Sequence, residues 1–544
     1  MKESKYPSGL FFLVFTEFWE RFGYYLMIGI FTLYMISDPS KGGLGWDNAD
    51  AADVFGTFIA MAYLTPFMGG LLADLKLGYR FSITLGGILM GIGYCMLAIP
   101  EKWAFFTALA IMVIGNGFFK PNISTLLGNL FNDPRYKHKK DTGYNIFYMG
   151  INLGAFICNF IAAIMRNKIG WGGAFMTAGI GMFLGVITFW IGMKHYKHVD
   201  VRKEPKPEDK PFLMQFAKVL GVGLLFSIVG WMIPDNIMGS DSTDAFFMFC
   251  IPVIYFFSSI YFKATAEEKK PLGTMFTIFL IVILFWAIFK QNGTALTTYA
   301  EFYTDREAPS SIVSVTNKLE FSDTTYARNE TVLQYDEQFR KIKGSDGKPI
   351  KCQDYPPYFK NLDQKKYPAP GEGLYLINTE IFQSVNPFFV VALTPLIIAF
   401  FAFMRKRNKE PTTASKIAYG LLISALSTLV MVVAVNLSDN GMQKASAWWL
   451  IASYGVVTVG ELLLSPMGLS MVSKLSPVRL TALMMGGWSL ATSIGNKLSG
   501  VLAKNWDKFD NKANYFWLNF ALLMVATIIM FVLLKRLNRV FKEQ

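Results

Sequence analysis

The chain has 544 residues, of which 53% are hydrophobic and only 17% are charged, and its mean hydropathy is +0.34. Soluble domains carry about 25% charged residues, so this composition excludes an ordinary soluble protein. The formal net charge of +13 could suggest a nucleic-acid partner. However, Lys and Arg gather in alternate loops between apolar runs, which is the positive-inside pattern of a membrane protein and explains the charge without nucleic acid.

Apolar runs of about 20 residues, the length that crosses a bilayer, recur along the chain and predict about fourteen membrane spans. We expect these spans near 10–36, 50–74, 79–99, 103–127, 144–166, 172–194, 211–233, 244–263, 273–300, 381–404, 414–436, 446–473, 479–503 and 514–537. The basic loops follow even-numbered spans, so we expect both termini in the cytoplasm of a multi-pass protein of the cell (inner) membrane. The predicted fold class is all-α integral membrane.

The spans group into three parts and one insert. We expect an N-terminal six-helix bundle over 1–194, a cytoplasmic linker with two extra spans over 195–270, and a C-terminal six-helix bundle over 271–544. Two six-helix halves around a central site are the plan of many secondary transporters. The C-terminal part contains a polar segment, 301–383, which we expect to be a solvated loop or a small lid on the outer side.

The first span is unusual because it holds three charged residues. Glu17, Glu20, Arg21 and Tyr24 follow i, i+3, i+4, i+7 spacing and therefore share one helix face. A charged face in a membrane helix must face water or the bundle interior, because facing lipid costs several kcal/mol per charge. We interpret this face as a functional site. The alternative is a structural ion-pair cluster that locks helices together.

The stretch Glu17-Phe18-Trp19-Glu20-Arg21-Phe22-Gly23-Tyr24-Tyr25 reads ExxERFxYY. It resembles the first-helix motif of the proton-dependent oligopeptide transporters, a family of the major facilitator superfamily. Further segments resemble the same family: GGLLADLKLGYR (69–80), GNGFFKPN (115–122), FYMGIN (147–152), SVNP (384–387), GELLLSPMGLSMVSKLSP (460–477) and GGWSLATSIGNKLSG (486–500). The resemblance implies the major facilitator fold, and the two extra helices between the bundles resemble prokaryotic members.

This resemblance also implies which residues hold a peptide, which is a zwitterion. The peptide carboxylate would bind Arg21 and Lys120, and its amine would bind Glu461. Asn152 and Asn386 would hold the polar groups of the peptide backbone.

Further roles follow from the same resemblance. Side-chain pockets would be shaped by four aromatic residues: Tyr24, Tyr25, Tyr63 and Trp488. For each of them, anchoring at the membrane interface or packing in the core is the alternative. Asp74 and Arg80 would form a charged gate pair.

The sequence departs from the family at two positions. Lys290, in FWAIFKQNG (285–293), stands where the family usually has an acid, and Ile28 stands where it usually has an Arg. In the family these two positions form an ion pair that links the halves, and a double change avoids leaving one buried charge unpaired. We expect Lys290 to pair with Glu17, Glu20 or the ligand; the alternative is that it points into a solvated crevice.

The predicted function is import of di- and tripeptides by alternating access, coupled to protons. The candidate proton-coupling residues are Glu17, Glu20, Arg21 and Lys290, because burial and neighbouring charges tune when the carboxylates ionise. We expect peptides, protons and membrane lipid as partners, a monomer, and no cofactor, metal, nucleic acid or enzymatic activity.

Two alternative functions stay open. The same fold could carry modified peptides or organic anions with altered or absent proton coupling, which Lys290 and Ile28 favour. The chain could also be a membrane receptor or scaffold that acts through the outer insert.

Overall fold

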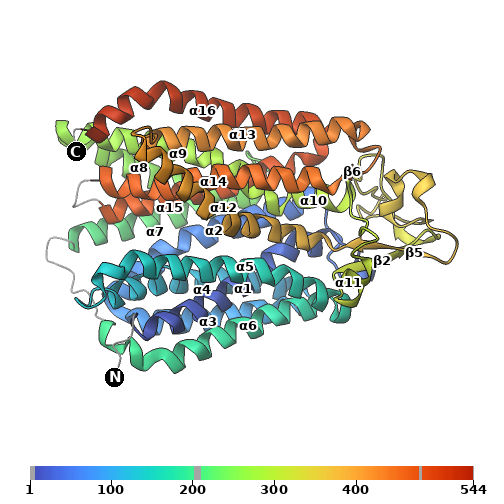
Figure 1. Cartoon of the computed structure of the whole chain (residues 1–544), viewed down its shortest axis with the longest axis horizontal. Helices are drawn as coiled ribbons and strands as arrows, with labels where there is room; N and C mark the ends of the chain where they lie inside the picture. Colours follow the sequence, from blue (N-terminus) through green and yellow to red (C-terminus); the bar gives the residue numbers. More distant parts are fainter. Residues whose placement is uncertain (1–5, 201–209, 477–480, 543–544) are drawn as a thin grey trace.

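A computed structural model describes residues 6–200, 210–476 and 481–542, with the side chains of some residues in these ranges, including Asp74, left undescribed. The long helices lie lengthwise beside one another, with both termini at one end and the insert at the other (Figure 1). We call the end that carries the insert the outer end and the opposite end the inner end.

Within the described residues, fourteen α-helices have 18 or more residues, which confirms the all-α prediction and matches the expected spans. The first six are α1 (Gly9–Ile36), α2 (Asn48–Leu72), α3 (Tyr79–Met96), α4 (Lys102–Leu130), α5 (Lys140–Ile169) and α6 (Trp171–Gly192). Two more follow, α7 (Lys210–Trp231) and α8 (Asp241–Lys263). The last six are α9 (Ala266–Phe289), α12 (Val385–Lys406), α13 (Thr413–Leu437), α14 (Ala447–Leu475), α15 (Thr481–Lys504) and α16 (Lys512–Lys542). By length and composition, ten segments of the described chain could cross a membrane.

The span expected over 273–300 is not one continuous helix. α9 ends at Phe289, the 3-10 turn η6 covers Lys290–Gly293, and α10 (Ala295–Phe302) continues to the outer end. Thr294, between them, has φ −129° and ψ −92°, outside the helical region. Gln291 secures the break, since its side-chain oxygen accepts hydrogen bonds from Tyr515 (2.7 Å) and Asn519 (2.8 Å) of α16. Broken helices at membrane depth are typical of transporter binding sites.

The insert is a small folded cap rather than a solvated loop. β2 (Ser322–Tyr326) pairs antiparallel with β5 (Gly373–Ile377), and β3 (Glu330–Leu333) pairs antiparallel with β4 (Lys351–Asp354). A short helix, α11 (Val313–Lys318), precedes β2. The cap has its own apolar cluster, formed by Tyr358, Phe359, Leu362, Leu374 and Leu376.

The cap contacts both groups of long helices. On the C-terminal side, β1 (Thr304–Asp305) pairs in parallel with β6 (Ala445–Ser446), directly before α14. On the N-terminal side, Lys341 donates to the backbone carbonyls of Ile36 and Trp46, at 2.6 Å each. The cap therefore joins the outer ends of α1 and α14.

The N-terminal helices (α1–α6) and the C-terminal helices (α9–α16) meet most closely where α2 passes α15. A Cβ on Gly56 would lie 2.7 Å from the Cα of Gly500, so only glycine permits this crossing. Further along, Ser493 donates to the carbonyl of Ala60 at 2.6 Å.

The described hydrogen bonds between the two groups lie between the middle of the helices and their outer ends. Thr32 of α1 donates to the Gly293 carbonyl at 2.5 Å, and Asn159 of α5 donates to Ser384 at 3.1 Å. This structure is therefore closed by polar contacts at the outer end.

Candidate functional site

The charged face of α1 forms one buried cluster. The Arg21 guanidinium donates from two nitrogens to the Glu20 carboxylate, and its Nε lies 3.4 Å from Glu17 Oε1. All three side chains are at most 5% exposed. Among the described residues, Glu17 Oε2 is buried without a hydrogen-bond partner. The cluster thus keeps one carboxylate oxygen free to accept a proton or a ligand.

The aromatic residues after Arg21 lie close to its charge. The Arg21 guanidinium carbon is 5.0 Å from the ring centre of Tyr24 and 6.0 Å from that of Tyr25. The two rings stand edge to face at 5.4 Å. The expected proximity of Arg21, Tyr24 and Tyr25 is therefore present.

Tyr63 of α2 brings together cations from the two helix groups. The Lys120 ammonium of α4 lies 3.9 Å from the Tyr63 ring centre, and the Lys290 ammonium of η6 lies 5.6 Å from it. Lys290 also lies 5.4 Å from the Trp286 ring centre. A tyrosine ring partly offsets the two positive charges by cation–π attraction, but it does not neutralise them.

Lys290 does not have the carboxylate partner expected from the sequence. Glu17 and Glu20 both pair with Arg21, and in the described part of the chain no carboxylate oxygen lies within 4.0 Å of the Lys290 ammonium. The bidentate geometry of arginine outcompetes a more distant lysine for these acids. Of the expected partners, only a ligand is left.

Glu461 of α14 is held by an amide from α12. Asn386 Nδ2 donates to Glu461 Oε2 at 3.1 Å and to Thr458 Oγ1 at 2.9 Å. Lys290 is close enough to interact electrostatically with Glu461 without forming an ion pair. Asn386 and Glu461, which were expected to bind different parts of a peptide, are thus bonded to each other near Lys290.

Two further expected site residues, Asn152 and Trp488, bond or pack within the helix groups. Asn152 of α5 donates to the Tyr148 carbonyl of its own helix at 2.9 Å, and is largely buried. Trp488 of α15 packs edge to face on Phe279 at 6.4 Å, and a Cβ on Gly468 would collide with its ring. In this structure the contacts of the Trp488 ring are those of a core residue.

Of the expected gate pair, Asp74 and Arg80, only Arg80 has a described side chain. The Asp74 side chain lies outside the described residues, and Arg80 Nε instead donates to Asp200 Oδ2 at 2.6 Å. Asp200 also accepts the backbone N–H of Tyr79 at 2.8 Å, so it caps the start of α3. Asp200 could not be predicted from the sequence, because no periodic pattern links it to α3.

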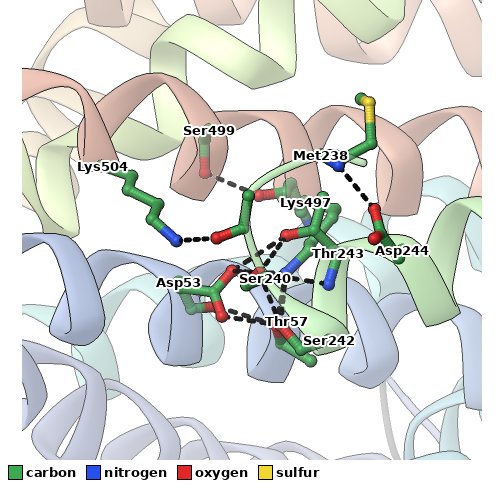
Figure 2. Close-up of polar contacts among 12 residues, drawn as sticks. Asp53, Thr57, Met238, Ser240, Ser242, Thr243, Asp244, Lys497, Ser499 and Lys504 are labelled. Atoms are coloured by element: carbon green, nitrogen blue, oxygen red, sulfur yellow. Dashed lines mark hydrogen bonds and ion pairs between the residues drawn. The ribbon is translucent and has the colours of Figure 1, made fainter. Parts of the chain in front are cut away.

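A second polar cluster, also missed, joins three parts of the chain near the outer end (Figure 2). We call it the outer clasp; its members are Asp53 and Thr57 of α2, Ser240, Ser242 and Thr243 at the start of α8, and Lys497 of α15. The fully buried Lys497 ammonium lies 2.8 Å from Asp53, 2.6 Å from Thr57 and 3.0 Å from Ser242.

The clasp explains how a lysine is accommodated inside the bundle. Asp53 also accepts hydrogen bonds from Ser240 (3.0 Å), Ser242 (2.6 Å) and Thr243 (3.0 Å), so the carboxylate is fully satisfied. Buried ion pairs are tolerated when such additional bonds complete them. In the sequence, Asp53 and Lys497 are charged residues inside two expected spans, and no pattern links them as partners.

Together these contacts place cations and a carboxylate around one region of the two helix groups. Lys120 comes from the N-terminal group, whereas Lys290 and Glu461 come from the C-terminal group. Such an arrangement can orient a small ligand that carries both charges.

Comparison with known sequences assigns the chain to a family. The sequence model of the POT family matches residues 80–312 and 371–518, more than half of the chain. The chain belongs to the POT family. The expected resemblance is confirmed, and the gap between the two matched ranges falls in the insert.

Curated relatives of this POT protein are transporters. A di-/tripeptide transporter of Lactococcus lactis subsp. lactis (strain IL1403) is 28% identical over 542 residues, covering 97% of this chain and 95% of the relative. The dipeptide and tripeptide permease A of Escherichia coli (strain K12) is 26% identical, covering 92% and 84%.

Solved structures of POT transporters share the fold. A crystal structure of a mutant peptide transporter POT in complex with alafosfalin is 29% identical, has a TM-score of 0.77, and covers 99% of this chain and 97% of that chain. A POT family transporter in complex with 5-aminolevulinic acid is 25% identical, with a TM-score of 0.75 and coverage of 98% and 97%. The chain is therefore a multi-pass membrane protein with the major facilitator fold.

Proposed function

We propose that this POT protein imports di- and tripeptides by alternating access and couples their movement to protons. The curated di-/tripeptide relatives support this substrate class. The observation that carries the proposal is the separation of charges around Tyr63, with Lys120 and Lys290 near its ring and Glu461 on α14.

A short peptide fits this charge pattern because it carries a carboxylate at one end and an ammonium at the other. Its carboxylate would bind Lys120 and Arg21, and its ammonium would bind Glu461 beside Asn386. Asn152 would bind backbone groups after exchanging its bond to Tyr148. Tyr24, Tyr25 and Tyr63 would contact side chains, and Trp488 would support that wall from the core.

Glu17 and Glu20 are the proposed proton carriers. Glu17 Oε2 is buried without a partner among the described residues, so a proton on this oxygen would remove an unsatisfied charge. Protonation would also weaken the hold on Arg21, which could then bind the peptide carboxylate. Lys290 would replace the usual acid as the group that senses the ligand from the C-terminal side.

Alternating access would move the bundle 1–194 against the bundle 271–544, with the two extra helices between them. Opening the outer end requires breaking Thr32–Gly293, Asn159–Ser384 and the outer clasp. The loop charges support cytoplasmic termini in this proposal. A monomer in the inner membrane is part of the same proposal. Asp74 and Arg80 would gate the inner end.

A second candidate is transport of organic anions or modified peptides by the same site. Lys290 favours it, because this ammonium has no carboxylate partner within 4.0 Å among the described residues and would attract a further negative charge. In this case uptake would not depend on a free peptide amine.

The test is uptake of labelled di-alanine by proteoliposomes that contain the full chain. Glu461→Gln should reduce uptake strongly, whereas Glu267→Gln, an exposed acid at the inner end, is the matched control. If N-acetylated di-alanine enters as fast as di-alanine, the organic-anion candidate is preferred. If neither is transported by folded protein, the proposal fails.

A further inference from the structure

A cavity of about 390 Å³ lies between the cap and the outer ends of the helices. Helices contribute Ile36, Arg166 and Glu301 to its wall, and the cap contributes Thr325 and Tyr358. Its volume falls in the range of small-molecule sites, which is about 300 to 1,000 Å³. It shares no residue with the expected central site around Lys120 and Glu461.

The wall of this outer cavity carries both signs of charge. Its carboxylates are Asp38, Glu301, Asp323 and Glu380. Its cations are Lys41, Arg166 and Arg306. Most of these charges already pair within the protein, as Arg166 does with Asp323 and Glu380, so a ligand would have to bind the polar atoms that stay unpaired.

Two buried groups in the wall are only partly satisfied. Glu380 is 1% exposed; its Oε1 accepts from Arg166 Nε at 2.6 Å, whereas its Oε2 has no partner among the described residues. Arg306 is 6% exposed; its Nη1 donates to the Ile377 carbonyl at 2.9 Å and its Nη2 lies 3.2 Å from Glu301, whereas its Nε–H has no described partner. Leaving such buried groups unpaired is unfavourable, so a ligand that pairs with them gains affinity.

The cavity is accessible from the outer end. The side chains of Lys41 and Asp323 in its wall are 66% and 44% exposed. A solute in the outer water can therefore enter the cavity without crossing the helix bundle, whereas Glu380 Oε2 and Arg306 Nε lie buried in its wall.

We propose that this outer cavity is a second binding site for short zwitterionic peptides. Glu380 Oε2 accepts from the peptide ammonium, and Arg306 Nε–H donates to the peptide carboxylate. The choice of short peptides as the ligand rests on the proposed function. The outer cavity would hold peptides beside the outer end before they enter the central site.

The experiment is protection of a cysteine in the cavity wall. Thr324, an exposed wall residue, is replaced by Cys in a Cys352→Ser background, and the full chain in proteoliposomes reacts with a membrane-impermeant maleimide. Di-alanine at ten times its dissociation constant should slow labelling about tenfold, because only the free fraction reacts. N-acetyl di-alanine amide, which carries neither charge, should not slow it.

Three variants test which residues are responsible for the protection by di-alanine. Glu380→Gln should weaken protection about 10- to 100-fold, because a charged hydrogen bond contributes about 1.5–3 kcal/mol. Arg306→Lys, which keeps the charge but loses the Nε–H, should weaken it as well. The matched control, Glu337→Gln, removes an exposed acid of the cap outside the cavity wall and should leave protection unchanged.

Glu461→Gln separates the two sites. Protection that persists in this variant supports an outer site, even if uptake shows that the proposed central function is wrong. Protection that disappears in Glu461→Gln, or that survives both Glu380→Gln and Arg306→Lys in folded protein, would overturn the proposal. So would an absence of protection in the Thr324→Cys parent.

Discussion

Replacing Lys497 by methionine should release the outer end of the helix bundle. The change keeps the length of the side chain but leaves Asp53, whose side chain is 13% exposed, without its cation. Breaking one partner of a buried ion pair costs about 3–5 kcal/mol. The loss falls on the outer-closed conformation, because the pair joins α2 to α15.

The size of the effect can be stated as a shift in population. A loss of about 3 kcal/mol changes a closed-to-open ratio of 100:1 to about 1:1. Asp53→Asn combined with Lys497→Met removes both charges together, so this double variant should recover more than half of the lost free energy.

The assay is pulsed electron paramagnetic resonance on spin labels at the outer end. Ser40→Cys and Lys508→Cys are exposed positions beside α1 and α15, and Cys352→Ser removes a partly exposed native thiol. Lys497→Met should add a population at longer distance, which shrinks again in the double variant. A single unchanged distance in Lys497→Met, or equal opening in the single and double variants, would refute the reasoning.

Three further predictions follow from the site and the cap. Glu461→Gln should weaken di-alanine binding about 10- to 100-fold, which corresponds to the loss of one charged hydrogen bond. Binding of N-acetyl di-alanine should not weaken. Equal losses for both ligands in equilibrium binding would contradict this prediction. Lys290→Ala should change the uptake rate or its pH dependence, because Lys290 contacts the Tyr63 ring and no described carboxylate neutralises it; uptake that matches the parent at every pH would contradict this. Burial lowers the pKa of Lys341 to about 8. Between about pH 8 and 10.5 the docked cap therefore binds fewer protons than the undocked chain. The free energy of unfolding the docked cap then rises by up to ~1.4 kcal/mol per pH unit. In thermal unfolding this rise should be absent in Lys341→Met, and an identical pH dependence in both proteins would contradict it.

The helices could be predicted from the sequence because membrane spans follow simple length and polarity rules. The expected first span, 10–36, and α1 (Gly9–Ile36) differ by one residue, since its apolar run has clear polar ends. The break after α9 was missed because Lys290–Gly293 lies inside an otherwise apolar run, and the bonds from Gln291 to α16 that hold it are long-range.

Local charge clusters were also predictable, whereas long-range ones were not. Glu17, Glu20 and Arg21 are neighbours on one helix, so their spacing alone brings them together. The outer clasp joins Asp53 to Lys497, which are 444 positions apart in the chain. No helical period links such residues, and only the packing of α2 on α15 makes them partners.

The fold of the cap also could not be predicted from local sequence patterns. Its polar composition and lack of long apolar runs predicted a loop or lid, because its core is made of scattered residues such as Phe359 and Leu376. The partners that fix it, Lys341 with Ile36 and Arg166 with Glu380, come from distant helices. Its fold therefore depends on surfaces that the segment itself does not contain.

Uptake of labelled di-alanine into proteoliposomes, with and without an inward proton gradient, tests the central claim most directly. We predict accumulation above the outside concentration only when the gradient is present, and a loss of that accumulation in Glu461→Gln. Uptake that merely equilibrates under both conditions, or no uptake by folded protein, would contradict it.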